Sequence, residues 1–324
     1  MRLVIIGYGT LLAAILCGTT TCAQQEKTTK PQGGKTAPGQ KRIKYDAENG
    51  WQFSLLTGYR QENLHWSIAG NSYGQDPNVY SELIWKKLSG TVLHASLLWQ
   101  AHKRWRFRAE GNRAVITRGS VTDTDYRDDN RANASYRQQF GSDKGYTASW
   151  LAGAGYALLP ESRFSITPYI GYAASYQNVY LVDPVAMLGL LNSSYKTQWY
   201  GPFVRVESVL QLTRKLDFIA GILYSQLNYH AQANWNLIST FNHPLSFRHE
   251  AKGYSIDING ELRYKLSRAA RINVLAGYFN RQTGTGIDQL YLASGQTDKT
   301  RLNGVGSDGF SVMAGLGISL RSRK

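Results

Sequence analysis

Strict alternation of apolar and polar side chains constrains the fold of this chain more than any other feature. From Tyr254 to Leu266, apolar or aromatic residues stand at every second position except Gly260, and polar residues stand between them. A period of two is the pattern of a β-strand with one face in an apolar environment. The same alternation recurs at 105–110, 200–211 and 310–320. These stretches predict an all-β protein.

The lengths of the strands and of their connections favour a membrane barrel over a soluble sandwich. Many of the alternating stretches reach about ten residues, the length that a tilted membrane-spanning strand needs, and Tyr and Trp stand near their ends. The chain offers short turns at 100–103, 160–162, 214–215 and 267–270, and long polar loops near 64–78, 119–142, 181–195, 231–250 and 283–306. Four short and five long connections join ten strands. We therefore predict a ten-stranded antiparallel transmembrane β-barrel over 50–320 with five long extracellular loops, closed because lipid tolerates no unpaired strand edge.

The first residues indicate export. Arg2 precedes an apolar run at 3–16, and small residues lead to a cleavage position after Ala23, so residues 1–23 are predicted to be a signal peptide. Residues 24–49 contain too little apolar surface to fold, and we expect a flexible periplasmic segment there; residues 321–324 form a basic tail. Both cysteines, Cys17 and Cys22, lie in the leader, so we expect no disulfide, thiolate metal site or cysteine nucleophile in the mature chain. The sequence has no phosphate-loop, dinucleotide or HExxH motif, and we expect no cofactor and no metal. The predicted location is the bacterial outer membrane.

The charge of the chain predicts an anionic partner. There are 37 Lys and Arg against 22 Asp and Glu, a formal net charge of +15. For an exported chain, the expected counter-charge is outer-membrane lipid, above all lipopolysaccharide, and not nucleic acid. A solvated basic surface without a partner is the alternative interpretation.

Charged residues also mark the predicted inner face of the barrel. They are Glu82, Lys86, Arg106, Arg108, Glu110, Arg205, Glu207, Asp257, Glu261 and Arg263. Side chains nearly fill a barrel of about eight strands, so one of ten is narrow. Mixed charges would cross-link such a lumen, which argues against an open pore.

Four short segments and the loop spacing resemble the omptin family of outer-membrane proteases. The segments are Ser81–Lys86 (SELIWK), Asp123–Tyr126 (DTDY), Tyr169–Tyr172 (YIGY) and Gly315–Gly317 (GLG), and the resemblance spans the predicted barrel. It implies a site in a groove at the extracellular mouth, where an Asp-x-Asp pair and an Asp-x-His pair hold a water and the His takes its proton. Asp123 and Asp125 match the first pair and are the predicted catalytic residues.

The second pair of the resemblance has no counterpart in this sequence. Two alignments place it at Asn236 and Ile238 or at Asn234 and Asn236, neither of which is Asp-x-His. Three histidines lie in or beside this loop and could supply the imidazole instead, or could be ordinary loop residues: His230, His243 and His249.

Two further residues take roles from the resemblance. Glu62 falls where omptins place an acid that recognises a basic substrate side chain, although it could equally be an exposed residue at a strand end. Tyr172 matches a tyrosine of the lipopolysaccharide-binding cluster, but Ala174 and Tyr176 stand in place of its charged members.

The sequence thus favours an omptin-like barrel with an incomplete proteolytic site. Its expected role is binding, adhesion or envelope structure through the outer loops, with an extracellular peptide or protein as partner. Two alternatives stay open: an active omptin-type endopeptidase that cleaves near basic residues, and a small diffusion pore.

Overall fold

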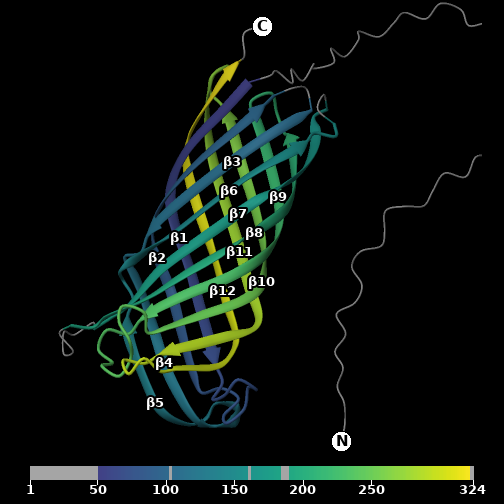
Figure 1. Ribbon diagram of the computed structural model, residues 1–324. Helices are drawn as coiled ribbons and strands as arrows, with labels where there is room; N and C mark the ends of the chain where they lie inside the picture. The colour runs from purple at the N-terminus through teal and green to yellow at the C-terminus, as the bar shows by residue number, and fades with distance from the viewer. Residues whose placement is uncertain (1–49, 102–103, 160–161, 184–189, 322–324) are drawn as a thin grey trace, which may run out of the picture. The chain divides into compact units, whose positions relative to one another are not determined.

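The predicted all-β barrel is confirmed (Figure 1). The computed structural model describes residues 50–101, 104–159, 162–183 and 190–321. The predicted signal peptide, the polar segment 24–49 and residues 322–324 of the basic tail lie outside the described residues. Among the residues described, no helix is long and apolar enough to span a membrane. The strands are β1 (Gly50–Ile68), β2 (Ser81–Gln100), β3 (Trp105–Val115), β4 (Arg118–Asp128), β5 (Ala132–Gly141), β6 (Gly145–Tyr156), β7 (Phe164–Val182), β8 (Asn192–Gln211), β9 (Leu216–Asn234), β10 (Phe247–Lys265), β11 (Ala270–Tyr291) and β12 (Thr297–Arg321).

The twelve strands form one closed antiparallel sheet. β1 pairs with both β2 and β12, which closes the ring. β2 pairs with β3 over one part of its length and with β4 over the next, so β4 prolongs β3. In the same way β6 pairs with β3 and β5 pairs with β4, so β5 prolongs β6. The twelve strands therefore occupy ten positions around the ring, as predicted.

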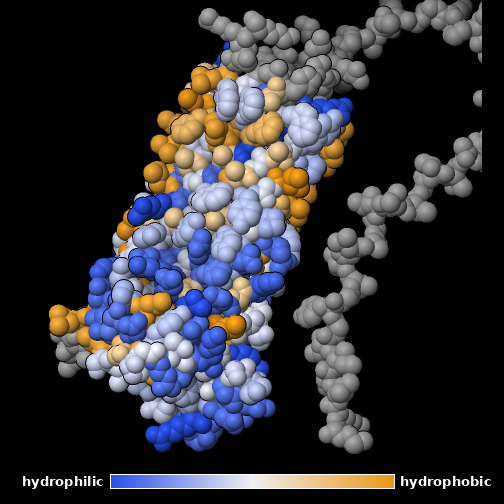
Figure 2. All heavy atoms as spheres, viewed as in Figure 1, coloured by the Kyte–Doolittle hydropathy of each residue, from blue (hydrophilic) through white to orange (hydrophobic). Residues whose placement is uncertain are grey.

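A belt of exposed apolar side chains surrounds one part of the barrel (Figure 2). Stacked or edge-on aromatic pairs border it on both sides, as in the aromatic girdles of outer-membrane barrels. The pairs are Trp51–Trp99 and Trp105–Tyr156 at one border, and Trp150–Tyr172 and Tyr224–Tyr254 at the other. The described parts of the short connections and both ends of the described barrel lie beyond the first border, and β4 and β5 project beyond the second (Figure 1). Because such barrels turn their short connections to the periplasm, β4 and β5 lie outside the cell.

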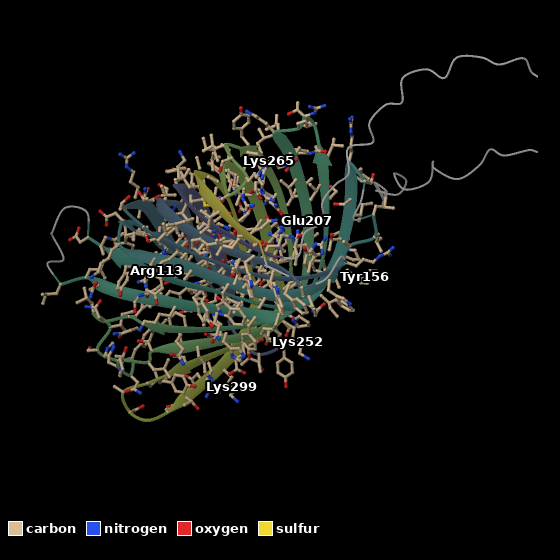
Figure 3. The ribbon with its side chains drawn as sticks, turned by 90° about the horizontal axis from the view of Figure 1, so that it is seen from above. Arg113, Tyr156, Glu207, Lys252, Lys265 and Lys299 are labelled. Carbon is tan, nitrogen blue, oxygen red and sulfur yellow. The ribbon has the colours of Figure 1, made fainter. Side chains whose placement is uncertain are left out.

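Ion pairs cross the lumen within the belt. Arg108 on β3 donates hydrogen bonds to Glu110, at 2.7 Å, and to Glu207 on β8, at 2.8 Å. Arg205 donates to the same two carboxylates, each at 3.0 Å. β3 and β8 are not neighbours in the sheet, so the network spans the interior, where side chains crowd around Glu207 (Figure 3). The predicted cross-linking of the lumen by mixed charges is confirmed for these four residues.

The prediction that Glu82 and Lys86 face the lumen is wrong. Lys86 is exposed, and Glu82 pairs with the exposed Arg131 outside the barrel. The ladder between β2 and β4 shifts between Lys86 and Ser89. A bulge adds one residue to a strand, so the alternation reverses beyond it and Leu83 faces inward instead.

The interior of the outer half is apolar. One cluster of buried residues fills it, with Trp85 stacked on Tyr195 at 5.4 Å and Trp199 against Tyr229 at 4.4 Å between ring centroids. Burial of both phenols in this cluster raises the pKa of each above its ordinary value. The cluster closes the barrel below its mouth.

Two predicted loops, 119–142 and 283–306, are largely strand, and a third, 231–250, is strand at both ends. The segment 119–142 is the hairpin of β4 and β5; β9 and β10 extend into 231–250, and β11 and β12 into 283–306. The alternation is obscured there because both faces of a strand beyond the membrane can be polar.

Candidate functional site

A pocket of about 550 Å³ opens at the outer mouth of the barrel. Its walls come from β1, β2, β4, β5, β7, β8, β10 and β11, together with the described parts of the β1–β2, β7–β8 and β9–β10 connections. Most of the lining is aromatic or aliphatic, including Trp66, Leu83, Phe140, Trp235 and Phe247, which also belong to the buried cluster below. The pocket is thus a hollow in the top of the apolar core.

Asp123 and Asp125 form an acidic pair on one wall of the pocket. They are two residues apart on β4, so both side chains point to the same face of the strand. On β5, Gln138 and Tyr136 stand directly opposite them and line the same pocket. Ser81 donates a hydrogen bond to Asp125, whereas Oδ1 of Asp123 is buried without a hydrogen-bond partner among the described residues. The catalytic role of the pair stays a prediction.

The environment of this pair favours one retained proton. Burial, with a smaller contribution from the Asp125 carboxylate, raises the pKa of Asp123 to about 7. Burial also raises the pKa of Asp125, against the opposing hydrogen bond from Ser81. Near neutral pH, a partly protonated carboxyl therefore stands beside a carboxylate.

A third carboxylate, Asp288 on β11, lines the pocket, and two side chains contact it. Thr300 Oγ1 donates to its Oδ2 at 3.0 Å. His249 Nε2 lies 3.0 Å from its Oδ1, close enough for an ion pair although the N–H is not aligned for a hydrogen bond. The other ring nitrogen, Nδ1, lies 2.7 Å from the Tyr195 hydroxyl, and the His249 side chain is 0% exposed. The imidazole thus contacts Asp288 but is sealed from the pocket.

The other two loop histidines lie elsewhere. His230 faces outward, with its ring stacked on Tyr200 at 5.6 Å and a side chain that is 45% exposed. His243 is exposed and bonds to Asn234. His249 faces inward because it follows Phe247 and precedes Ala251 on the inner face of β10, and the alternation from Tyr254 would have placed it there.

Sequence reasoning did not single out Asp288, because a register shift hides it. On β11, Phe279 and Arg281 face inward at odd positions. The pairing with β10 slips by one residue within 283–286, so beyond it Asp288 faces inward and Ile287 is exposed. Glycines within a strand often mark a bulge, and the run Thr-Gly-Thr-Gly at 283–286 is the available signal.

Glu62 and Tyr172 lie away from the pocket. Glu62 is 1% exposed and accepts hydrogen bonds from Arg60 Nε, at 2.8 Å, and Gln177 Nε2, at 2.7 Å, below the pocket. It does not line the pocket, so this position offers no support for the substrate-binding role carried over from the resemblance. Tyr172 lies in the aromatic border of the belt beside Trp150, facing the membrane. Its lipid-binding role stays a prediction.

The pocket is acidic in a basic protein. Its described lining contains three aspartates and no Lys, Arg or His, although the chain has a formal charge of +15. Across the described part of the chain, no three His, Cys, Asp or Glu side chains lie close enough together to hold a metal ion. The arrangement suits a ligand that combines apolar surface with positive charge.

Comparisons with known proteins agree with the barrel. The crystal structure of the outer membrane protease OmpT from Escherichia coli superimposes with a TM-score of 0.66 at 12% identity, over 84% of this chain and 97% of that chain. OprG from Pseudomonas aeruginosa (TM-score 0.37, 11% identity, 85% and 98% covered) and the NalP translocator domain from Neisseria meningitidis (0.38, 11%, 83% and 88%) are too dissimilar to support an argument.

The likeness to OmpT, at this low identity, concerns the fold alone. No curated protein matches the chain in sequence. A family model does match, over residues 54–320, and it describes outer-membrane proteins. The chain therefore resides in the bacterial outer membrane and belongs to the family named for the Protochlamydia outer membrane protein, Pom.

Proposed function

We propose that the outer mouth of the barrel binds an extracellular ligand with an apolar body and a positively charged group. The observation behind this proposal is the lining of the pocket: three carboxylates, no described cation, and walls that are otherwise mostly apolar. Ligand sites are typically apolar hollows with a few polar groups that fix orientation. Asp123, Asp125 and Asp288 are those groups here.

Partial burial strengthens the expected attraction for a cation. Burial and the neighbouring Asp125 raise the pKa of Asp123 to about 7, so this carboxyl is partly protonated near neutral pH. A bound ammonium or guanidinium would supply that charge and favour the ionised carboxylate. Ligand binding should therefore release a proton from Asp123.

The contacts behind Asp288 support a binding role over a catalytic one for the His249–Asp288 pair. His249 is fully buried, and both of its ring nitrogens face protein groups. A general base must come within hydrogen-bond reach of the proton that it takes, and this ring is not placed to do so. We assign His249 the role of positioning the Asp288 side chain.

The filled interior favours this proposal over a diffusion pore. The ion pairs between Arg108 and Glu207 cross the lumen, and the apolar cluster lies between them and the mouth. A solute would have to displace both layers.

Binding of a small apolar amine tests the proposal. Phenethylamine should bind the refolded barrel, whereas 2-phenylethanol, of the same shape but uncharged, should bind much more weakly; calorimetry measures both. Asp123→Asn should lower the affinity for phenethylamine. The matched control is Asp143→Asn, which replaces an exposed acid outside the pocket and should leave the affinity unchanged. Equal affinity for amine and alcohol, or no loss in Asp123→Asn, contradicts the proposal.

Endopeptidase activity is the second candidate function. The adjacent carboxyl and carboxylate of Asp123 and Asp125 favour it, because such a pair can share a proton and activate a water. Cleavage of a fluorogenic peptide with two adjacent basic residues, with lipopolysaccharide present, tests it. Turnover that is lost in Asp123→Asn supports hydrolysis; binding of the peptide without turnover leaves a binding site.

Lipopolysaccharide is the lipid partner that we expect. Cations held over aromatic rings lie just beyond the belt: the Arg113 guanidinium lies 4.5 Å from the Tyr146 ring centroid, and the Lys144 ammonium lies 4.7 Å from that of Tyr180. Phosphate groups of an anionic lipid would meet them at this level. Lipopolysaccharide should therefore raise the thermal stability of the wild type more than that of Arg113→Gln/Lys144→Gln, and an equal effect on both would oppose this assignment.

A further inference from the structure

Among the described residues, β5 is a strand with one edge that is unpaired over most of its length. Its first edge pairs with β4 from Ala132 to Gly141. Its second edge meets β7 at a single pair, Gly141 with Val182. No other strand in the described ranges pairs with that edge, and the side chains from Ala132 to Gln139 are all exposed. Nine residues of β5 thus extend beyond the last pair with β7.

This edge borders the pocket. Tyr136, Gln138 and Phe140 line the pocket from β5, opposite the acidic pair on β4. β7 ends at Val182, level with Gly141, while β4 and β5 continue outward (Figure 1). The unpaired edge of β5 therefore lies beside the pocket that Tyr136 and Gln138 line.

We infer that the ligand of the pocket is an extended polypeptide segment that adds to the unpaired edge of β5 as a further strand. This inference rests on the proposed function and names the class of its ligand. Successive side chains of a strand point to opposite faces, so every second side chain of the added segment would enter the pocket. Main-chain hydrogen bonds to β5 would supply affinity, and the pocket would select the side chains.

Charge complementarity identifies the kind of segment. The side chains that enter the pocket would meet Asp123 and Asp125 beside an apolar lining, which suits Lys or Arg alternating with Leu or an aromatic residue. Two of the usual features that block strand addition are absent from β5, since it contains no Pro and Arg137 is its only charged residue. The pairing of β5 with β4 shifts register between Tyr136 and Ala134, so the regular part of the edge runs from Tyr136 to Gly141, beside the pocket.

N-methylation of a model peptide tests the inference. The probe is an eight-residue peptide with Thr at every even position and with Lys and Leu in turn at the odd positions. Two derivatives carry N-methyl groups on the odd or on the even residues. Only every second N–H of a strand points to one neighbour, so one derivative should lose about 100-fold in affinity and the other should bind like the parent. Fluorescence anisotropy of the labelled peptides on refolded barrel measures all three.

Each other outcome is decisive. Equal affinity of the three peptides would mean binding through side chains alone and would overturn strand addition. Equal loss in both derivatives would also overturn it. Failure of the parent peptide while phenethylamine still binds would refute the polypeptide ligand and leave the proposed function intact; failure of both would refute the proposed function.

Two controls complete the experiment. Asp123→Asn should weaken binding of the parent peptide, whereas Asp143→Asn should leave its affinity unchanged. Light scattering of the barrel without peptide gives its mass. A dimer that the peptide does not dissociate would assign the β5 edge to a second copy of this chain and would overturn the inference.

Discussion

Replacing Asp123 with Asn should stabilise the barrel in a pH-dependent way. The pKa of this carboxyl rises from an ordinary 3.8 to about 7 on folding, because the folded protein buries it beside Asp125. A raised pKa in the folded state means that the group's contribution to stability is fully present below pH 3.8 and is lost as the pH rises through about 7. A shift of about three units corresponds to roughly 4 kcal/mol.

Asn does not ionise, so the variant avoids this cost. The free energy of unfolding of Asp123→Asn should exceed that of the wild type by up to about 4 kcal/mol at pH 8.5 and should nearly equal it at pH 4. Reversible urea unfolding in lipid vesicles, followed by tryptophan fluorescence, measures the difference, with exposed Asp143→Asn as the control. If the hairpin of β4 and β5 opens by itself, amide exchange within 120–141 reports the same difference.

Two results would refute this reasoning. A gain of equal size at both pH values would mean that Asn improves packing or hydrogen bonding and that ionisation is not involved. No gain at pH 8.5 would mean that solvent or a counter-ion stabilises the Asp123 carboxylate.

Three further predictions concern the lumen, the support of the pocket and the ligand. Arg108→Ala leaves Glu207 with fewer buried partners and should cost about 3–5 kcal/mol in urea unfolding; an unchanged midpoint would contradict the ion-pair network. Tyr195→Phe keeps the ring but removes the hydroxyl that meets His249, and should cost about 1–3 kcal/mol in thermal unfolding; no change would mean that the contact is not stabilising. Affinity for phenethylamine should rise about 30-fold from pH 5.5 to 8.5 as Asp123 ionises, and a flat profile would exclude its carboxylate as the partner of the ammonium.

The sequence predicted the barrel well because the membrane constrains the order of apolar and polar residues within each strand. Lipid on one side and a polar lumen on the other force each spanning strand into strict alternation, and that alternation is legible from Tyr254 to Leu266 without any tertiary information. Closure follows since lipid tolerates no unpaired edge. The number of positions around the ring follows in turn from counting turns and loops.

The site was only half accessible to the same reasoning. Asp123 and Asp125 are two apart on one strand, so their shared face is a local property. Asp288 reaches the same pocket from a strand on the other side of β1, a proximity that exists only once the ring has closed.

Two β-bulges decided which way several other side chains face. The bulges at 86–89 and 283–286 reverse which positions face inward, so Glu82 turns outward and Asp288 turns inward. A bulge depends on the pairing of two strands and not on the pattern of either one. The sequence by itself therefore determined the membrane-spanning strands, their apolar outer faces and the shared face of the acidic pair. The tertiary structure decided the third carboxylate, the contacts that bury His249 and the unpaired edge of β5, because each depends on which strands become neighbours and in which register.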